Sequence, residues 1–264
     1  MTAGSQAPTH AGPAANEDAP GAAGAPNAAA TESSRARPPG LAATVGALLR
    51  KELLVELRTL ESVPGMSLFA VTTFVVFHFA LNRSSVDGDL AAGILWVTLL
   101  FAAILGINRL FVADADQGGF DGFLLAPVNR SALLFAKALA LLGYLVVLEV
   151  IAVPAFALLL LGPPLGRAMP DLLAVLALGD LGVAVIGTLV AGLAVRTRAR
   201  DLLGPLLALP LLVPVVIGCA RATEPLFSAT RATAPAARWL LTLGLYDLVF
   251  GLIAFSLFDF LLED

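Results

Sequence analysis

The stretch LAAGILWVTLLFAAILGINRLF, residues 90–111, decides the fold class of this chain. Its first charged residue is Arg109, near the end, and the side chains before it are almost all apolar. A helix rises about 1.5 Å per residue, so about 20 apolar residues cross a hydrocarbon core of about 30 Å. The stretch therefore predicts a transmembrane helix.

Five more apolar stretches occur along the chain. Together they predict six spans, at residues 66–81, 90–111, 133–161, 172–195, 202–220 and 239–262. The first of these is short and the third is long. We expect Pro154 to kink the third span, and Pro205, Pro210 and Pro214 to bend or locally break the fifth.

The composition leads to the same fold class. Of 264 residues, 58% are hydrophobic and 14% are charged, and the mean hydropathy is +0.89. An average soluble domain is about half apolar and a quarter charged. The excess of apolar residues excludes a soluble enzyme and a nucleic-acid-binding domain, and the single cysteine, Cys219, excludes a disulfide scaffold. We predict an all-α polytopic membrane protein with six transmembrane helices.

Residues 1–40 differ from the rest of the chain. Thirteen Ala, five Gly and six Pro fill 24 of these 40 positions, and large apolar side chains are almost absent. Such a segment cannot bury enough surface to offset the entropy of ordering it. We expect a disordered tail over residues 1–40 and a membrane domain over residues 45–264.

Residues 45–61 have a helical but polar pattern. The apolar residues that share one arc at 3.6 residues per turn are Leu49, Leu53, Leu57 and Leu60. The pattern indicates a helix that lies in the membrane interface, and its alternative is a helical extension of the first span. We favour the interfacial helix and expect Pro64-Gly65 to form the turn into the membrane.

The basic residues indicate the orientation of the chain. If the N-terminus is cytoplasmic, the inner flanks hold Arg50, Lys51, Arg58, Arg109, Arg130, Lys137, Arg196, Arg198 and Arg200. The outer loops then hold Arg83, Arg167, Arg221, Arg231 and Arg238. Nine residues against five favour both termini inside, because cytoplasmic loops carry an excess of Lys and Arg.

The connection between the second and third predicted spans, residues 112–132, is the segment richest in candidate functional residues. Acidic and glycine residues lead into a short apolar helix at 120–125, which Pro127 and Arg130 close. An exposed apolar helix is suited to docking a partner protein, and the alternative is a simple re-entry turn. We favour docking. The residues predicted for it are Asp114, Asp116, Gly118, Phe120, Asp121, Leu124, Leu125, Pro127 and Arg130.

Ionisable side chains inside the predicted spans are a second group of candidates. Glu149 and Asp180 lie deep in the third and fourth spans, where a charge is costly and usually functional. They fit either a proton relay or hydrogen bonds between helices. Lys137 lies one turn inside the third span and can extend to the interface. His78 fits either a haem ligand or, more commonly, a packing residue.

The sequence has no motif for ATP hydrolysis or for a metal site. It contains no GxxxxGK[ST] loop, no HExxH pattern and no cluster of Cys and His at metal-binding spacing. We therefore expect neither enzymatic activity nor a bound metal in this chain.

Two blocks of the sequence resemble the CcmB family, the haem exporter protein B of cytochrome c maturation. The first block includes Asp114 or Asp116, Gly118 or Gly119, Asp121, Leu124, Leu125, Pro127, Arg130, Ser131, Ala136 and Lys137. The second runs from residue 195 to 201 and continues through Pro205, Pro210 and Pro214 to residues 222–224. Asp121 and Asp201 depart from the family pattern, since Glu is expected at both.

The resemblance implies the permease half of an ABC-2-type transporter in the inner membrane. Such a subunit has an interfacial helix, here residues 45–61, and a coupling loop, here residues 112–132. The implied partners are a cytoplasmic CcmA-like ATPase, CcmC-like and CcmD-like membrane subunits, and a CcmE-like haem chaperone. The implied cargo is haem, for c-type cytochrome biogenesis, with no cofactor assigned to this chain.

Two other functions remain open at this point. One is an ion-coupled secondary carrier that uses Glu149 and Asp180, although paired repeats of broken helices, typical of such carriers, are not evident in the sequence. The other is a structural assembly factor without transport.

Overall fold

The computed structural model describes residues 40–83, 85–110, 130–161, 165–194, 200–228 and 237–261. Within these ranges the regular structure is entirely helical. Most of the predicted tail 1–40 and most of the predicted coupling loop 112–132 lie outside the described residues.

Seven α-helices make up the described chain. They are α1 Leu41–Thr59, α2 Ser62–Leu81, α3 Gly88–Arg109, α6 Arg130–Phe156, α7 Met169–Ala194, α8 Arg200–Phe227 and α9 Ala237–Leu261. A π-helical turn, η2 Ala157–Leu161, follows α6, and a 3-10 turn, η3 Leu165–Arg167, precedes α7. Every helix except α1 is long and apolar enough to cross a membrane. The prediction of an all-α polytopic membrane protein with six spans is confirmed.

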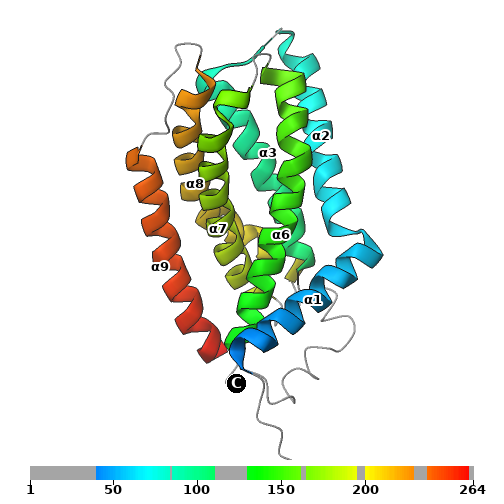
Figure 1. Ribbon diagram of the computed structural model, residues 1–264, viewed down its shortest axis with the longest axis vertical. Helices are drawn as coiled ribbons and strands as arrows, with labels where there is room; N and C mark the ends of the chain where they lie inside the picture. The colour runs from blue at the N-terminus through cyan, green and yellow to red at the C-terminus, as the bar shows by residue number, and fades with distance from the viewer. Residues whose placement is uncertain are drawn as a thin grey trace, which may run out of the picture. The chain divides into compact units, whose positions relative to one another are not determined.

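The six spanning helices run side by side, and α1 crosses them at an angle at the lower end of the view (Figure 1). We call this end the α1 end. Because the spans alternate in direction, it also holds the last turn of α3 and the first turn of α6, which flank residues 111–129. There α1 packs against α6.

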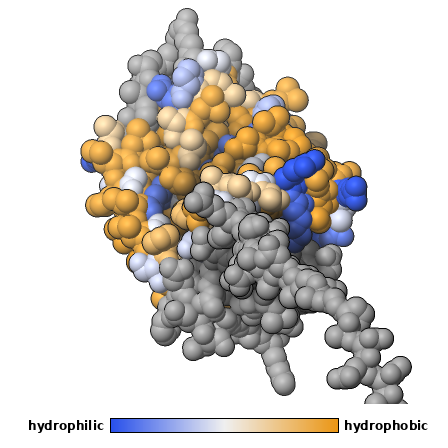
Figure 2. All heavy atoms as spheres, turned by 60° about the horizontal axis from the view of Figure 1, so that its bottom comes forward, coloured by the Kyte–Doolittle hydropathy of each residue, from blue (hydrophilic) through white to orange (hydrophobic). Residues whose placement is uncertain are grey.

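The helices α3 and α7 form the centre of the bundle, whereas α2 and α9 keep most of their surface exposed. α8 packs against both central helices. Exposed side chains on the outer helices are largely apolar, among them Val150, Leu241 and Leu245. In Figure 2 the surface toward the α1 end is mostly hydrophobic, with separate hydrophilic patches. This is the surface that a lipid environment requires of a spanning bundle.

The turn into the first span lies earlier than predicted. α1 ends at Thr59, Leu60 adopts the left-handed conformation with φ 50°, and its N–H bonds the Glu56 carbonyl. α2 then begins at Ser62 and is 20 residues long, so Pro64 and Gly65 are inside it. A proline is tolerated in the first helical turn because its missing N–H would have no partner there. The expected turn at Pro64-Gly65 is therefore wrong.

The prolines in the later spans act differently from one another. α8 is one continuous helix although it contains Pro205, Pro210, Pro214 and Pro225, so the expected break is wrong. α6 changes to the π-helical turn η2 three residues after Pro154. Neighbouring groups can bond carbonyls that a proline or a π-helical turn releases, as membrane helices require.

Three glycines of α7 allow its neighbours to approach closely. A Cβ at Gly179 would lie 2.7 Å from the Trp96 ring of α3, and one at Gly187 would lie 2.7 Å from Ile107 of the same helix. A Cβ at Gly182 would lie 2.5 Å from a carboxyl oxygen of Asp247 in α9. Small residues at such contacts are the usual basis of tight packing between membrane helices.

Replacing Gly187 with Ala is expected to destabilise the bundle by about 1–3 kcal/mol, because the added methyl group overpacks the contact with Ile107. The matched control is Gly93→Ala in α3, where a Cβ meets nothing within 4 Å. The thermal unfolding midpoints of both variants in detergent test this. Equal midpoints would show that α7 does not depend on its glycines for packing.

Candidate functional site

The predicted docking residues lie largely outside the described part of the chain. Asp114, Asp116, Gly118, Phe120, Asp121, Leu124, Leu125 and Pro127 all belong to the segment 111–129. Arg130 is the first residue of α6, and its side chain is not described. The structure does describe both ends of the segment, where α3 stops and α6 starts.

Lys137 connects these two ends to α1. Its ammonium lies 3.0 Å from Oε2 of Glu52 in α1 and donates a hydrogen bond of 2.8 Å to the Leu110 carbonyl, directly after α3. Its side chain is 1% exposed, so its ammonium is surrounded by protein groups. Within the bundle, Lys137 reaches a carboxylate that α1 supplies, and one cation thus joins α1, α3 and α6.

Glu56 fixes the turn between α1 and α2. Its Oε1 accepts hydrogen bonds of 2.9 Å from the backbone N–H groups of Ser62 and Val63, the first residues of α2. The N–H groups of a first helical turn have no partner inside the helix, and an acidic oxygen there also interacts favourably with the helix dipole. Glu56 therefore sets the angle at which the first span leaves α1.

A third acidic residue lies next to the end of α3. Glu61, between α1 and α2, pairs with Arg109 at 2.9 Å. Both side chains are more than half exposed, so the pair contributes only about 0–1 kcal/mol. We call the group of Glu52, Glu56, Glu61, Arg109 and Lys137 the α1 network.

The sequence showed Glu52 and Glu56 only as polar positions of a helix, and their partners were not predicted. Lys137 is 85 positions after Glu52, and no local pattern connects two residues at that distance. The Glu56 contact had no local signal either, because Glu56 lies inside α1, six residues before Ser62, and not at the N-cap position of α2.

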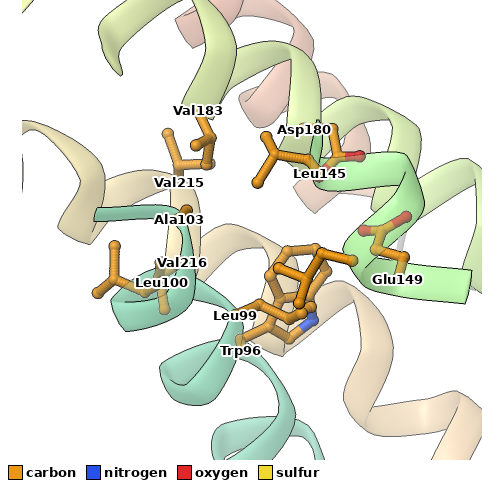
Figure 3. Close-up of a pocket in the computed structure, with 11 residues that line it drawn as sticks. Trp96, Leu99, Leu100, Ala103, Leu145, Glu149, Asp180, Val183, Val215 and Val216 are labelled. Atoms are coloured by element: carbon orange, nitrogen blue, oxygen red, sulfur yellow. The ribbon is translucent and has the colours of Figure 1, made fainter. Parts of the chain in front are cut away.

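The predicted intramembrane residues Glu149 and Asp180 do come together. They lie on the adjoining helices α6 and α7. Both line a narrow cavity with Trp96, Leu145 and Val215 (Figure 3). The cavity measures about 10 Å³, which is about the space of one water molecule.

Asp247 of α9 is a further buried carboxyl in this bundle. Its side chain is 5% exposed, and its carboxyl group lies against Gly182 of α7, two residues after Asp180. Asp247 lies inside the sixth predicted span, but no local pattern predicts its contact, because its burial depends on a glycine 65 residues away. Nearby, Trp96 donates to Thr223 at 2.9 Å and Thr223 donates to the Cys219 carbonyl, which joins α3 to α8.

His78 lies apart from both groups. Its Nδ1 bonds the Leu159 carbonyl in the π-helical turn η2. A carbonyl cannot donate, so Nδ1 carries the proton. Within the described residues there is no group of three or more His, Cys, Asp or Glu side chains that could hold a metal ion.

Comparison with known proteins gives the family. The family described as "CcmB protein" matches residues 43–258 of this chain. Heme exporter protein B of Rhodobacter capsulatus is 35% identical over 153 residues, which is 58% of this chain and 69% of the relative. Heme exporter protein B of Pseudomonas aeruginosa is 33% identical over 171 residues, 64% of this chain and 75% of the relative. The same protein of Bradyrhizobium diazoefficiens is 28% identical over 222 residues, 78% of this chain and 93% of the relative.

The matched residues 43–258 begin in α1 and end in α9, and they include Lys137 and its partner Glu52. The agreement therefore extends over every helix described above. This chain belongs to the CcmB family.

Proposed function

We propose that this chain is the membrane permease subunit of an ABC transporter that serves haem export in c-type cytochrome biogenesis. Three relatives that carry the name Heme exporter protein B and the family match over residues 43–258 support this function. The subunit is not itself the ATPase, since its sequence lacks the phosphate-binding loop of ATP-hydrolysing proteins.

The observation that carries the proposal is the position of Lys137. A partner that moves residues 111–129 moves the end of α3 and the start of α6, and both are tied to α1 through this one ammonium. Glu56 continues the connection into α2. Motion of the segment would thus reach three spanning helices and α1 together.

The strongest contacts of the α1 network are the buried ones, made by Lys137 and Glu56. Removing one partner of a buried ion pair typically costs about 3–5 kcal/mol, because a buried charge is left without compensation. The Glu56 cap contributes about 1 kcal/mol. Because of these two contacts, α1 would move together with α2, α3 and α6.

In this mechanism a separate ATPase docks on the coupling loop, with Phe120, Leu124 and Leu125 as the apolar contact and the acidic residues around them as its rim. The ATPase must bind one conformation of the membrane subunit more tightly than another, since a ligand shifts an equilibrium only through differential affinity. ATP binding and hydrolysis then alternate the two conformations.

The further parts of the proposal concern partners and placement. The ATPase is of the CcmA kind, the membrane partners are of the CcmC and CcmD kinds, and the haem chaperone is of the CcmE kind. The chain lies in the inner membrane with both termini in the cytoplasm, which the nine basic residues on the inner flanks support. Then the α1 end faces the ATPase. The cavity beside Glu149 is far too small for a porphyrin, so haem does not bind in it in this conformation.

An ion-coupled carrier is the second candidate, and the contact between Glu149 and Asp180 favours it. The two functions differ in what they need. The permease needs the coupling loop and an active ATPase, whereas the carrier needs the two carboxyls and no ATPase.

Substituting Leu124 and Leu125 with Asp is expected to abolish co-purification with the ATPase subunit and to stop c-type cytochrome formation, because charges replace the apolar contact. The variant should still insert in the membrane. The measurements are a pull-down from solubilised membranes and the haem-stained content of c-type cytochromes. The carrier replaces the permease as the better proposal if Glu149→Gln stops cytochrome formation and the loop variant does not.

Replacing Lys137 with Met is expected to destabilise the chain by about 3–5 kcal/mol and to stop cytochrome formation, because Glu52 loses its buried partner and keeps only the more distant, exposed Lys51. The control is Arg109→Gln, which removes an exposed pair at the same end and should cost at most about 1 kcal/mol. Detergent unfolding curves give the stabilities.

A third variant tests whether Lys137 stabilises the chain through its ion pair with Glu52. The double variant Glu52→Gln with Lys137→Met should be more stable than Lys137→Met alone, since no unpaired buried charge remains. Additive effects of the two substitutions would contradict a direct interaction between Lys137 and Glu52.

A further inference from the structure

Glu149 and Asp180 have no role in the coupling mechanism described above. They lie in the middle of the spans, away from the α1 end, on the helices α6 and α7, which pack against each other. Figure 3 shows them side by side at one edge of the cavity, Glu149 from α6 and Asp180 from α7.

Two carboxyl groups beside each other in an apolar bundle can bond only through a proton. An ionised carboxylate has acceptor oxygens only, so two ionised carboxylates cannot bond each other. A hydrogen bond between the two groups therefore needs one of them to be a carboxylic acid. Such a proton belongs to the pair rather than to either residue, because the two sites are directly coupled.

Among the described residues, no cation lies close enough to the pair to replace the proton. Asp180 is 6% exposed, and its Oδ2, like Oε1 of Glu149, has no hydrogen-bond partner among the described residues. The titratable groups that lie next to Asp180 from α8 and α9 are Cys219, at Gly179, and Asp247, at Gly182, and neither of them is basic.

The basic side chains of the adjoining helices are engaged elsewhere. Lys137 of α6 is twelve residues from Glu149, about 18 Å along the helix, and pairs with Glu52. Arg109 of α3 pairs with Glu61, and His78 of α2 bonds Leu159. The tryptophan that borders the cavity, Trp96, donates to Thr223. In the described chain the pair also lacks the third ligand that a metal ion would need.

We propose that Glu149 and Asp180 form a proton-binding site that holds α6 to α7 inside the membrane. The bound proton joins the two carboxyls as one O–H donor and one acceptor. Its loss leaves two negative charges beside each other in an apolar bundle, which is strongly unfavourable. The helices α6 and α7 therefore pack together with the proton bound, and they separate with its release.

The site lies on the helix that follows the coupling loop. α6 starts at Arg130 and carries Lys137 near its beginning and Glu149 further along. A displacement of α6 relative to α7 would open the contact between the carboxyls, and opening would release the proton to whatever water enters. The proposal concerns this chain alone and does not require the ATPase or haem.

Infrared spectroscopy of the full chain in lipid vesicles tests the site directly. The wild type at neutral pH should show a carboxylic-acid C=O band that shifts in D₂O. Glu149→Gln and Asp180→Asn should each shift or remove this band, since the two carboxyls share one proton. The three chains are compared in an Asp247→Asn background, because the buried carboxyl of Asp247 has no hydrogen-bond partner among the described residues and would add an acid band of its own. Absence of an acid band, or a band that responds to only one of the two substitutions, would overturn the proposal.

A distance measurement tests the link to helix packing. Spin labels at Val150→Cys and Leu181→Cys, both on exposed surface, report the separation of α6 and α7, while Cys219 is fully buried. The distance distribution of the otherwise wild-type chain should broaden as the pH rises and the proton leaves. With Glu149→Gln it should stay narrow at every pH, because the amide N–H is not lost. The same response in both chains would show that the proton does not hold the helices together.

Discussion

A lysine ammonium can be buried in a membrane bundle only where oxygen atoms surround it, and this requirement organises the α1 end of the protein. Lys137 meets it with the Glu52 carboxylate and the Leu110 carbonyl. Because the two oxygens come from different parts of the chain, the position of α1, the end of α3 and the start of α6 depend on one another. If α1, the end of α3 or the start of α6 is displaced, Lys137 loses one of these oxygen partners, and a buried polar group that loses its partner is costly.

The rest of the bundle gives this junction a rigid connection to the membrane interior. Glycines along α7 let α3, α8 and α9 approach it closely, and tightly packed helices transmit a displacement rather than absorb it. α6 extends from the junction at Lys137 to the carboxyl pair at Glu149. A displacement of α6 relative to α3 would thus be transmitted along packed helices to the carboxyl pair deep in the spans.

The sequence was sufficient for the parts of the fold that lipid dictates and insufficient for those that tertiary contacts dictate. Hydropathy located all six spans, because each must be apolar over a length set by the membrane. It misplaced the turn before α2, where Glu56 rather than Pro64 determines the geometry. It also could not anticipate the ion pair of Lys137 or the burial of Asp247, since each depends on a residue more than 60 positions away.

The most direct test of energy coupling through residues 111–129 is site-specific photo-crosslinking in membranes that contain the whole transporter. A crosslinking amino acid at position 124 should capture the ATPase subunit. The same amino acid at position 87, exposed at the opposite end of the bundle between α2 and α3, should not. Capture of the ATPase from position 87, or from neither position, would contradict coupling at the α1 end.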